Sequence, residues 1–540
     1  MKLIKNLTIF IGAAITISSC QKLDLAPTDR FSESNFWTVD ANVYNALNNN
    51  YSLIYNSGLY FYNESLSDNA YSSNGDYTVV SSGVYTSSLA KFRNDWGYYY
   101  STILSCNLFL QNVDQNTTLP SATISRLKAE TRFIRAFEHY NLAKWYGDVP
   151  LVDHVLSTEE AQQISRTSRD SVFQFVVSEL EAAAIDLPTQ DELPASENGR
   201  ITKAAAMALE ARVLLFMGNH MDEVATICEQ LMNNQTANGS YSLNSSYSAL
   251  FNNPTTNKTN NESILSLQYV PSVRTWSDFY DFAPRSVGGR VSSMAPTESL
   301  VESYIMLNGK SINETGSGYD ESNPYANRDP RLTATVVYDK YGWVNADGST
   351  KTIYIRPGSD PDRSAPDEYN QTSQSTTKTG YYWRKYFDPI AQAGFASGSN
   401  LHLIRYAEVL LDYAEAKNSL GQMDATVWDA TIGALRRRAG FTDEGALAYP
   451  TGGDMTNIIR NERRVELALE GIRPDDIRRW KIAEIVMNGV VHGAKFSDPT
   501  VDNGYIRVQN RQFDPSRNYL WPVPATEIGL NRNLTQNNGY

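Results

Sequence analysis

The chain has 540 residues, of which 41% are hydrophobic and 20% charged, so it is long enough and apolar enough to bury a large core. Its net charge of −13 at pH 7 argues against nucleic acid as a partner, because that partner requires a basic face, and it does not favour charge-driven contact with anionic lipid. The 33 tyrosines indicate amphipathic contact surface as well as core.

Residues 1–19 have the pattern of a secretory signal peptide. Two lysines precede an apolar run over residues 7–17, which is too short for a membrane-spanning helix. The following Ile-Ser-Ser before Cys20 resembles a bacterial lipobox, in which the cysteine carries acyl chains that anchor the protein without a membrane span. The alternative is an ordinary signal peptide that merely contains a cysteine. We expect residues 20–37 to be a linker between lipid and globule.

Residues 38–232 contain a succession of amphipathic helices, for example over residues 125–145, 168–187 and 202–217. In the last of these, small alanines line one face and permit close helix approach. Helix pairs of roughly 30–40 residues with small contact residues are typical of tetratricopeptide-like solenoids. Cys106 and Cys228 lie in helical apolar runs, so we expect two buried free thiols rather than a disulfide.

Residues 51–91 interrupt these helices with a loop-rich stretch. Tyrosines alternate there with Ser, Asn, Gly and Asp without a dominant period, which indicates a binding surface. Asp76 and Tyr77 lie within this stretch, and Trp96 lies at the opening of the next helix, where its side chain can face the loops.

Residues 233–400 form a predicted loop-rich insertion with short strands near residues 264–270, 333–338 and 351–355. Loops this long are usually functional. Pyranose rings present flat C–H faces that pack on aromatic rings, and their hydroxyls need polar partners nearby. One stretch of the insertion supplies both, and its candidates are Trp276, Tyr280, Arg285 and Arg290. The alternative is that the aromatic residues fill a satellite core under the loops.

Residues 401–540 complete the helical part, with helices predicted over residues 401–421, 426–440, 453–471 and 473–489. Arginines and acids alternate along the last two. An anion-binding site is one interpretation. We favour a lattice of guanidinium–carboxylate pairs, because nearly every arginine has an acid three or four positions away. Glu408 and Glu415 are interpreted as structural in the same way.

Three stretches carry a family resemblance: RYAEVLLDYAEAKN from Arg405, RNERRVELALEGIRPDDIRRW from Arg460, and the C-terminal YLWPVPATEIGLNRNLTQNNGY. They resemble the signature blocks of the SusD/RagB family, surface nutrient-binding lipoproteins that sit on TonB-dependent transporters. The resemblance implies a mostly α, tetratricopeptide-like scaffold with a loop-rich insertion containing short β strands. It also implies an outer-membrane location, a SusC-like TonB-dependent transporter as partner, and, by position, ligand contacts at Trp96, Tyr77, Asp76, Trp276 and Tyr280.

The expected function is therefore capture of an oligosaccharide or polysaccharide at the cell surface and its delivery to the transporter. The histidines are isolated and no zinc, nucleotide or nucleophile motif is present, so we expect no metal, no cofactor and no enzyme activity. A glycoside hydrolase on a helical scaffold stays open as an alternative, because its two carboxylates are paired by distance in space rather than by spacing in the sequence. A peptide-binding nutrient-uptake protein of the same family is another.

Overall fold

The structure is a computed structural model that describes residues 36–233, 235–391 and 393–540. The signal peptide expected over residues 1–19, Cys20 and most of the linker expected over residues 20–37 lie outside the described residues. In the part of the chain that is described, no helix is both long enough and apolar enough to cross a membrane.

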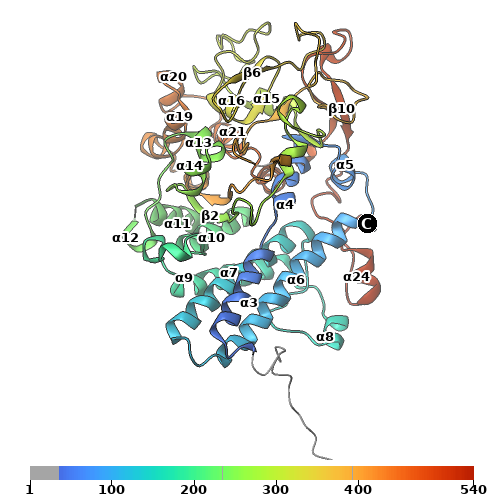
Figure 1. The fold of residues 1–540 in the computed structure, drawn as a ribbon. Helices are drawn as coiled ribbons and strands as arrows, with labels where there is room; N and C mark the ends of the chain where they lie inside the picture. Colours follow the sequence, from blue (N-terminus) through green and yellow to red (C-terminus); the bar gives the residue numbers. More distant parts are fainter. Residues whose placement is uncertain (1–35, 234, 392) are drawn as a thin grey trace, which may run out of the picture.

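The long helices form one continuous array. Each packs on the next, α6 on α7, α7 on α9, α9 on α10 and α10 on α11, and the array continues from α11 to α17 and α21 (Figure 1). The chain therefore inserts residues 234–405 between two helices that are neighbours in space. This stacking confirms the predicted, mostly α, tetratricopeptide-like fold class. The long helices are α3 (Asp40–Leu53), α6 (Ala90–Asn112), α7 (Ser121–Tyr146), α9 (Arg169–Asp186), α10 (Lys203–Met217), α11 (Met221–Asn233), α17 (Tyr406–Ser419) and α21 (Met455–Glu466).

Helix α10 illustrates how the sequence fixes these elements. The Thr202 side chain accepts a hydrogen bond from the backbone N–H of Ala205 and caps the start, and Gly218, at φ +83°, ends the helix in the left-handed region. The predicted small face is buried where α10 meets α9 and α11. A larger side chain on that face would push the neighbouring helices apart.

Short helices connect the array and build the insertion. Three fall in residues 51–91, so the loop-rich prediction for that stretch was only partly right. The short helices are α4 (Ser57–Tyr62), η1 (Asn63–Leu66), α5 (Gly75–Ser82), η2 (Val113–Gln115), α8 (Thr158–Gln163), η3 (Gln190–Glu192), η4 (Ala195–Glu197), α12 (Gln235–Asn238), α13 (Tyr247–Asn252), α14 (Pro254–Lys258), η5 (Asp278–Asp281), η6 (Arg285–Val287), α15 (Glu298–Ser303), α16 (Pro330–Thr335), η7 (Ala393–Phe395), α18 (Ala425–Trp428), η8 (Asp429–Gly433), α19 (Ala434–Ala439), α20 (Glu444–Leu447), α22 (Arg473–Arg479), α23 (Ala483–Val486), η9 (Asp502–Gly504) and α24 (Ala525–Leu530).

The strands pair into small antiparallel sheets of two strands each. The pairs are β1 (Ala70–Ser72) with β3 (Met294–Pro296), β2 (Ser263–Leu267) with β8 (Leu401–Arg405), β4 (Val336–Val337) with β7 (Tyr382–Trp383), β5 (Tyr341–Val344) with β6 (Thr350–Ile353), and β9 (Gly489–His492) with β10 (Arg507–Arg511). The strands predicted near residues 264–270 and 351–355 correspond to β2 and β6. The strand predicted over residues 333–338 is mostly wrong, because Asp329 caps a helix there and Pro330 suits its first turn.

The helix predicted over residues 401–421 needs a correction at its start. Residues 401–405 form β8, paired with β2, and the helix begins only at Tyr406. All five residues of β8 are buried. A strand buried on both faces has no polar alternation, so its apolar residues matched a helical period by coincidence.

The other C-terminal helices are also shorter than predicted. A π-helical turn, η8, divides the helix expected over residues 426–440. Helix α21 ends at Glu466, and Leu469 takes a positive φ of 63° before Gly471. The helix expected over residues 473–489 is broken between α22 and α23. The predicted N-cap at Asp454 is confirmed, since its side chain accepts hydrogen bonds from the N–H groups of Thr456 and Asn457.

One large hydrophobic cluster joins the helical array to the insertion. Trp145 of α7 stacks on Trp521 from the C-terminal segment, with ring centroids 4.2 Å apart. Trp343 and Trp383 of the insertion are buried in the same cluster, so these aromatics belong to the main core rather than to a ligand surface or a satellite. Cys106 and Cys228 are buried free thiols, as predicted.

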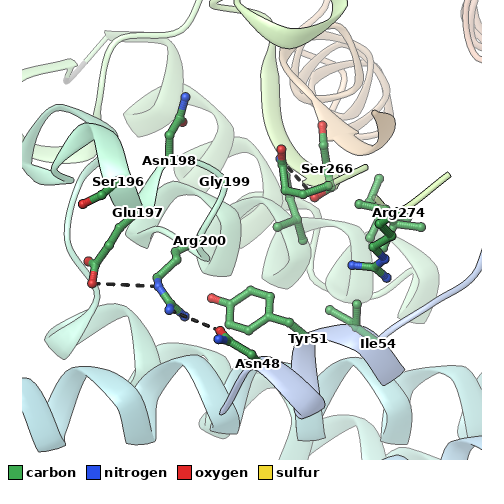
Figure 2. A pocket seen from close by; sticks show the side chains of 14 residues that line it. Asn48, Tyr51, Ile54, Ser196, Glu197, Asn198, Gly199, Arg200, Ser266 and Arg274 are labelled. Carbon is green, nitrogen blue, oxygen red and sulfur yellow. Dashed lines mark hydrogen bonds and ion pairs between the residues drawn. The ribbon is translucent and has the colours of Figure 1, made fainter. Parts of the chain in front are cut away.

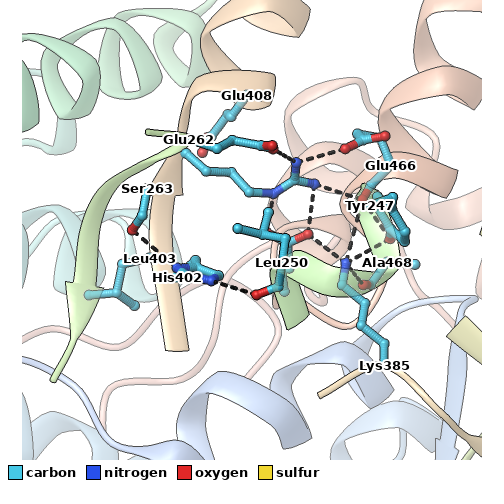
Figure 3. A network of polar contacts seen from close by, with 12 residues as sticks. Tyr247, Leu250, Glu262, Ser263, Lys385, His402, Leu403, Glu408, Glu466 and Ala468 are labelled. Carbon is cyan, nitrogen blue, oxygen red and sulfur yellow. Dashed lines mark hydrogen bonds and ion pairs between the residues drawn. The ribbon is translucent and has the colours of Figure 1, made fainter. Parts of the chain in front are cut away.

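The charges of the C-terminal part form a buried lattice, as the favoured interpretation predicted. The Nη1 atom of Arg405 lies 2.7 Å from both Glu262 and Glu466, and its Nε lies 2.8 Å from Glu470. Figure 3 shows Glu262 and Glu466 meeting at this guanidinium, with the ammonium of Lys385 alongside. A buried charge needs such partners to offset the loss of water.

The lattice differs from the prediction in where its partners come from. Arg463 pairs with Asp412 of α17 at 2.5 Å and with Asp476 of α22 at 2.9 Å, both distant in sequence. Glu408 pairs with Arg212 of α10, and Glu415 pairs with Arg479, each at 2.6 Å, so both carboxylates are structural as predicted. Arg479 also pairs with Asp476 three positions earlier in α22, as the spacing predicted, but the other pairs named here join separate elements of the fold.

Candidate ligand-binding surface

Two loop segments more than 200 positions apart meet at the β1–β3 pair. Ser72 lies opposite Met294, and the backbone N–H of Ser73 donates to the Ser293 carbonyl at 2.8 Å. This pairing places α4 and α5 beside η5 and the loop that follows it. We call the cluster formed there by Tyr62, Tyr77, Tyr280, Asp281 and Arg290 the tyrosine surface.

Two half-buried rings form one part of the tyrosine surface. The centroids of Tyr62 and Tyr77 lie 5.3 Å apart, with 33° between the ring planes. Phe282, which is fully buried, packs edge-on against Tyr62 at 5.3 Å and supports it from below. The Tyr62 hydroxyl lies 2.7 Å from Ser293 Oγ, so the ring is fixed at both ends.

The Tyr62 and Tyr77 phenols remain protonated at neutral pH. Burial raises the pKa of Tyr62 to about 12, and burial is also the main cause of the raised pKa of Tyr77. Each hydroxyl can therefore donate as well as accept a hydrogen bond.

An arginine and a carboxylate form the other part of the tyrosine surface. Arg290 donates from Nε and Nη2 to the two carboxylate oxygens of Asp281, both at 2.9 Å, and its guanidinium lies 5.0 Å from the ring centre of Tyr280. The Arg290 side chain is 57% exposed. Because the fork to Asp281 leaves Nη1 unused, the guanidinium is held in place while it still offers donors to a ligand.

A buried ion pair lies under Tyr77. Lys91 Nζ is 4.1 Å from the ring centre of Tyr77 and 2.8 Å from Asp95, and both charged side chains are buried. The cation attracts the electron-rich face of the ring and fixes its position. Asp76, predicted as a ligand contact, precedes Tyr77 in the first turn of α5 and is half-buried.

Two predicted contacts lie elsewhere. Trp276 is only 3% exposed, its Nε1 donates to the Ser399 carbonyl at 2.7 Å, and its ring packs 5.1 Å from Phe61 in the core. Neither face of the Trp276 ring is open to a ligand, so the structure does not support the prediction that Trp276 contacts the ligand. Arg285 is exposed, but its guanidinium points to another loop and donates to Ser375 Oγ at 3.2 Å.

Trp96 is separated from the tyrosine surface as well. It is 5% exposed and packs edge-on against Tyr146 at 5.0 Å. What remains accessible lines an apolar groove of about 500 Å³ between α6, α8 and α24, shared with residues such as Tyr100 and Leu530. Tyr77 does not line this groove, so Trp96 is not positioned to act together with Tyr77.

The candidates taken from the sequence did not include Tyr62 and Asp281, which the structure places on the tyrosine surface. Both lie in stretches that were singled out, but no local pattern distinguishes them from the neighbouring tyrosines and aspartates. Their roles depend on the β1–β3 pairing, which joins distant segments. Chemically, the tyrosine surface offers apolar ring faces beside fixed donors and acceptors. In the described ranges, no group of three or more His, Cys, Asp or Glu residues could hold a metal ion.

The fold and this surface define a class of protein in which a helical-repeat scaffold carries a contact surface on inserted loops. Residues 228–540 match the SusD family, and residues 23–215 match a family described as starch-binding and associating with the outer membrane. Because the first match covers more than half of the chain, the protein belongs to the SusD family.

Individual relatives agree with this assignment. The chain is similar to SusD-like protein P2 of Formosa agariphila, with 27% identity over 463 residues that cover 82% of this chain and 80% of the relative. It is similar to a crystal structure of a SusD-like carbohydrate-binding protein from Bacteroides fragilis, with 31% identity and a TM-score of 0.82, covering 93% of this chain and all of the other. A second SusD-like protein of Bacteroides fragilis has 28% identity and a TM-score of 0.76, covering 95% of this chain and all of the other.

Proposed function

We propose that this protein captures oligosaccharide or polysaccharide at the tyrosine surface without cutting it. The observation that carries the proposal is the juxtaposition of the Tyr62 and Tyr77 rings with the Arg290–Asp281 fork beside Tyr280. Sugar rings pack their C–H faces on such aromatic rings, and their hydroxyls bond to the fixed polar groups. The similar Bacteroides fragilis protein is described as carbohydrate-binding, which supports the same chemistry here.

Binding at a partly open surface of this kind is weak, about 4–7 kcal/mol, or millimolar to about ten micromolar. Weak binding suits a protein that must release its ligand. Affinity electrophoresis of the purified protein through gels containing a panel of polysaccharides tests the proposal, with retardation by at least one neutral glycan expected. Retardation by none of them, under conditions where a known glycan-binding protein is retarded, would refute capture of glycan and favour peptide cargo.

The hydrolase alternative is separated by a second measurement on the same panel. We expect no reducing ends to accumulate when the protein is incubated with the glycan that retards it. A time-dependent and concentration-dependent release of reducing ends, retained after repeated purification, would instead identify a glycoside hydrolase.

We also propose that the protein is anchored in the outer membrane by lipid at Cys20, faces the cell exterior, and delivers glycan to a SusC-like TonB-dependent transporter. The family described as associating with the outer membrane matches residues 23–215 and supports the location. In cells fed an alkyne fatty acid, the wild type should incorporate label and Cys20→Ser should not.

The transporter partnership is tested separately. Tagged protein extracted in mild detergent should bring down a TonB-dependent transporter, and consistent absence of the transporter would contradict the partnership.

A further inference from the structure

A hollow that is separate from the tyrosine surface lies where the helical array meets the insertion. It has a volume of about 280 Å³ and is bounded by α3, the loop after η4 and strand β2 (Figure 2). An adjoining hollow of about 150 Å³ shares the wall formed by Gly199, Arg200, Ser266 and Gln268. Together they are large enough for a small ligand of one or two sugar rings.

Arg274 is the unusual group in this hollow. It ends a tight turn in which the backbone groups of Val270 and Arg274 bond to each other, and its guanidinium lies 5.1 Å from the ring centre of Tyr269. Among the residues that the structure describes, no carboxylate lies within ion-pair distance of it and no acceptor bonds to its guanidinium. The cation is half-buried and oriented, yet unpaired.

The other arginine of the hollow differs in this respect. Arg200 lies 3.2 Å from the buried carboxylate of Glu130, donates to Asn48 at 3.3 Å, and approaches Glu197 at 4.0 Å. Figure 2 shows Arg200 and Arg274 on opposite sides of the hollow, with Tyr51 and Ile54 between them. Arg126 also pairs with Glu197, so the two arginines Arg126 and Arg200 are matched by the two acids Glu130 and Glu197. Arg274 is therefore the unmatched positive charge of the hollow.

The rest of the lining is neutral. The Tyr51 hydroxyl is already used, because it donates to Glu130 and accepts from the N–H of Ile201, so this residue offers its ring rather than its oxygen. Ile54 and Leu403 add apolar surface, and the side-chain amides of Asn48 and Gln268 add polar groups. This set fits a ring with C–H faces and hydroxyls that also carries an anion.

We propose that this hollow binds a sugar acid, with the Arg274 guanidinium receiving its carboxylate. A guanidinium presents two parallel N–H groups that match the two oxygens of a carboxylate. In a protein with a net charge of −13, an unpaired and oriented cation inside a hollow is the place where such an anion is favoured. The site is distinct from the tyrosine surface and does not depend on it.

Titration calorimetry and saturation-transfer NMR with D-glucuronate, D-glucose and inorganic sulfate test the proposal. We expect glucuronate to bind, Arg274→Gln to weaken that binding about tenfold or more, as expected for loss of a charged hydrogen bond, and glucose to bind at least about tenfold more weakly. Arg532→Gln, at an exposed arginine elsewhere, is the matched control and should leave the affinity unchanged. Competition by sulfate would extend the site to sulfated sugars, and lack of competition would restrict it to carboxylates.

Unchanged glucuronate affinity in Arg274→Gln, or glucose binding as tightly as glucuronate, overturns the proposal. If Arg274→Gln does not fold, Asn198→Trp, which fills the hollow from an exposed loop, replaces it, and unaltered glucuronate binding then overturns the proposal. Tyr77→Ala separates the two sites, since it should weaken binding of a neutral glycan at the tyrosine surface and leave glucuronate binding intact.

Discussion

The guanidinium of Arg405 and the carboxylate of Glu466 lie 2.7 Å apart, 61 positions apart in the sequence, with both side chains almost fully excluded from solvent. Arg405 is the last residue of β8 and Glu466 the last of α21, so the pair ties the base of the insertion to the helical array. The lattice around it therefore fixes how the two parts of the chain meet.

Removing one partner of this pair should destabilise the protein strongly. Arg405→Met leaves the carboxylates of Glu262, Glu466 and Glu470 buried without the cation that they share, and we expect a loss of about 3–5 kcal/mol in the free energy of unfolding. Urea denaturation measures it. Arg437→Gln, which breaks an exposed pair with Asp429, is the control and should cost about 0–1 kcal/mol. Equal losses in the two variants would show that the buried lattice is not structural.

The tyrosine surface predicts that its rings contribute to glycan affinity. Tyr77→Ala and Tyr280→Ala should each weaken binding by about 1–3 kcal/mol, because each removes an aromatic contact face. Isothermal titration with the glycan identified by affinity electrophoresis measures the change. Tyr319→Ala, at a half-buried tyrosine that packs on Arg328 instead, should bind as the wild type does. Unaltered affinity in both surface variants would remove the tyrosine surface as the binding site.

Trp276 should behave as a core residue. Trp276→Ala removes a ring that is 3% exposed and packs on Phe61, so we expect the unfolding free energy to fall by about 3–5 kcal/mol. Thermal unfolding followed by circular dichroism measures this loss. A stable variant with weakened glycan binding would instead restore Trp276 as a ligand contact and contradict its buried position.

Glu298 should make stability depend on pH. Burial raises the pKa of Glu298 from 4.5 to about 8, while the Tyr381 hydroxyl donates to it at 2.6 Å. The folded protein keeps this proton up to about pH 8, whereas the unfolded chain releases it near 4.5. This carboxyl therefore lowers stability as the pH rises between those values.

Replacement of Glu298 by Gln removes that titration. Between pH 5.5 and pH 8.5, we expect the unfolding free energy of Glu298→Gln relative to the wild type to rise by about 2–3 kcal/mol. Guanidinium denaturation at the two pH values measures the difference. Glu314→Gln, at an exposed carboxylate, serves as the comparison and should show no such rise. A constant difference for Glu298→Gln would show that its carboxyl is ionised in the folded protein.

Local patterns in the sequence were sufficient for much of the helical array. The cap at Asp454, the proline in the first turn of α22 and the small face of α10 follow from hydrogen bonding and packing within a few turns of helix. The same patterns failed at residues 401–405, where burial on both faces removed the polar alternation that marks a strand.

The candidate site shows more clearly that local sequence patterns do not predict which side chains are exposed. Trp276 and Tyr280 are four positions apart in one aromatic stretch, yet the first is buried and the second is half-exposed beside Arg290. No local sequence pattern distinguishes the buried residue from the exposed one. The difference arises because Phe61 and Ser399, from distant segments, enclose Trp276.

The sequence by itself determined that the chain is a mostly helical scaffold with a long insertion, that Cys106 and Cys228 are buried, and that the arginines of the C-terminal part form a structural lattice. Only the tertiary structure decided which aromatic residues face solvent, which acid pairs with which arginine, and that no acid in the described part of the chain lies within ion-pair distance of Arg274. Periodicity and capping are properties of neighbouring residues, whereas exposure and ion pairing depend on which distant segments the folded chain brings together.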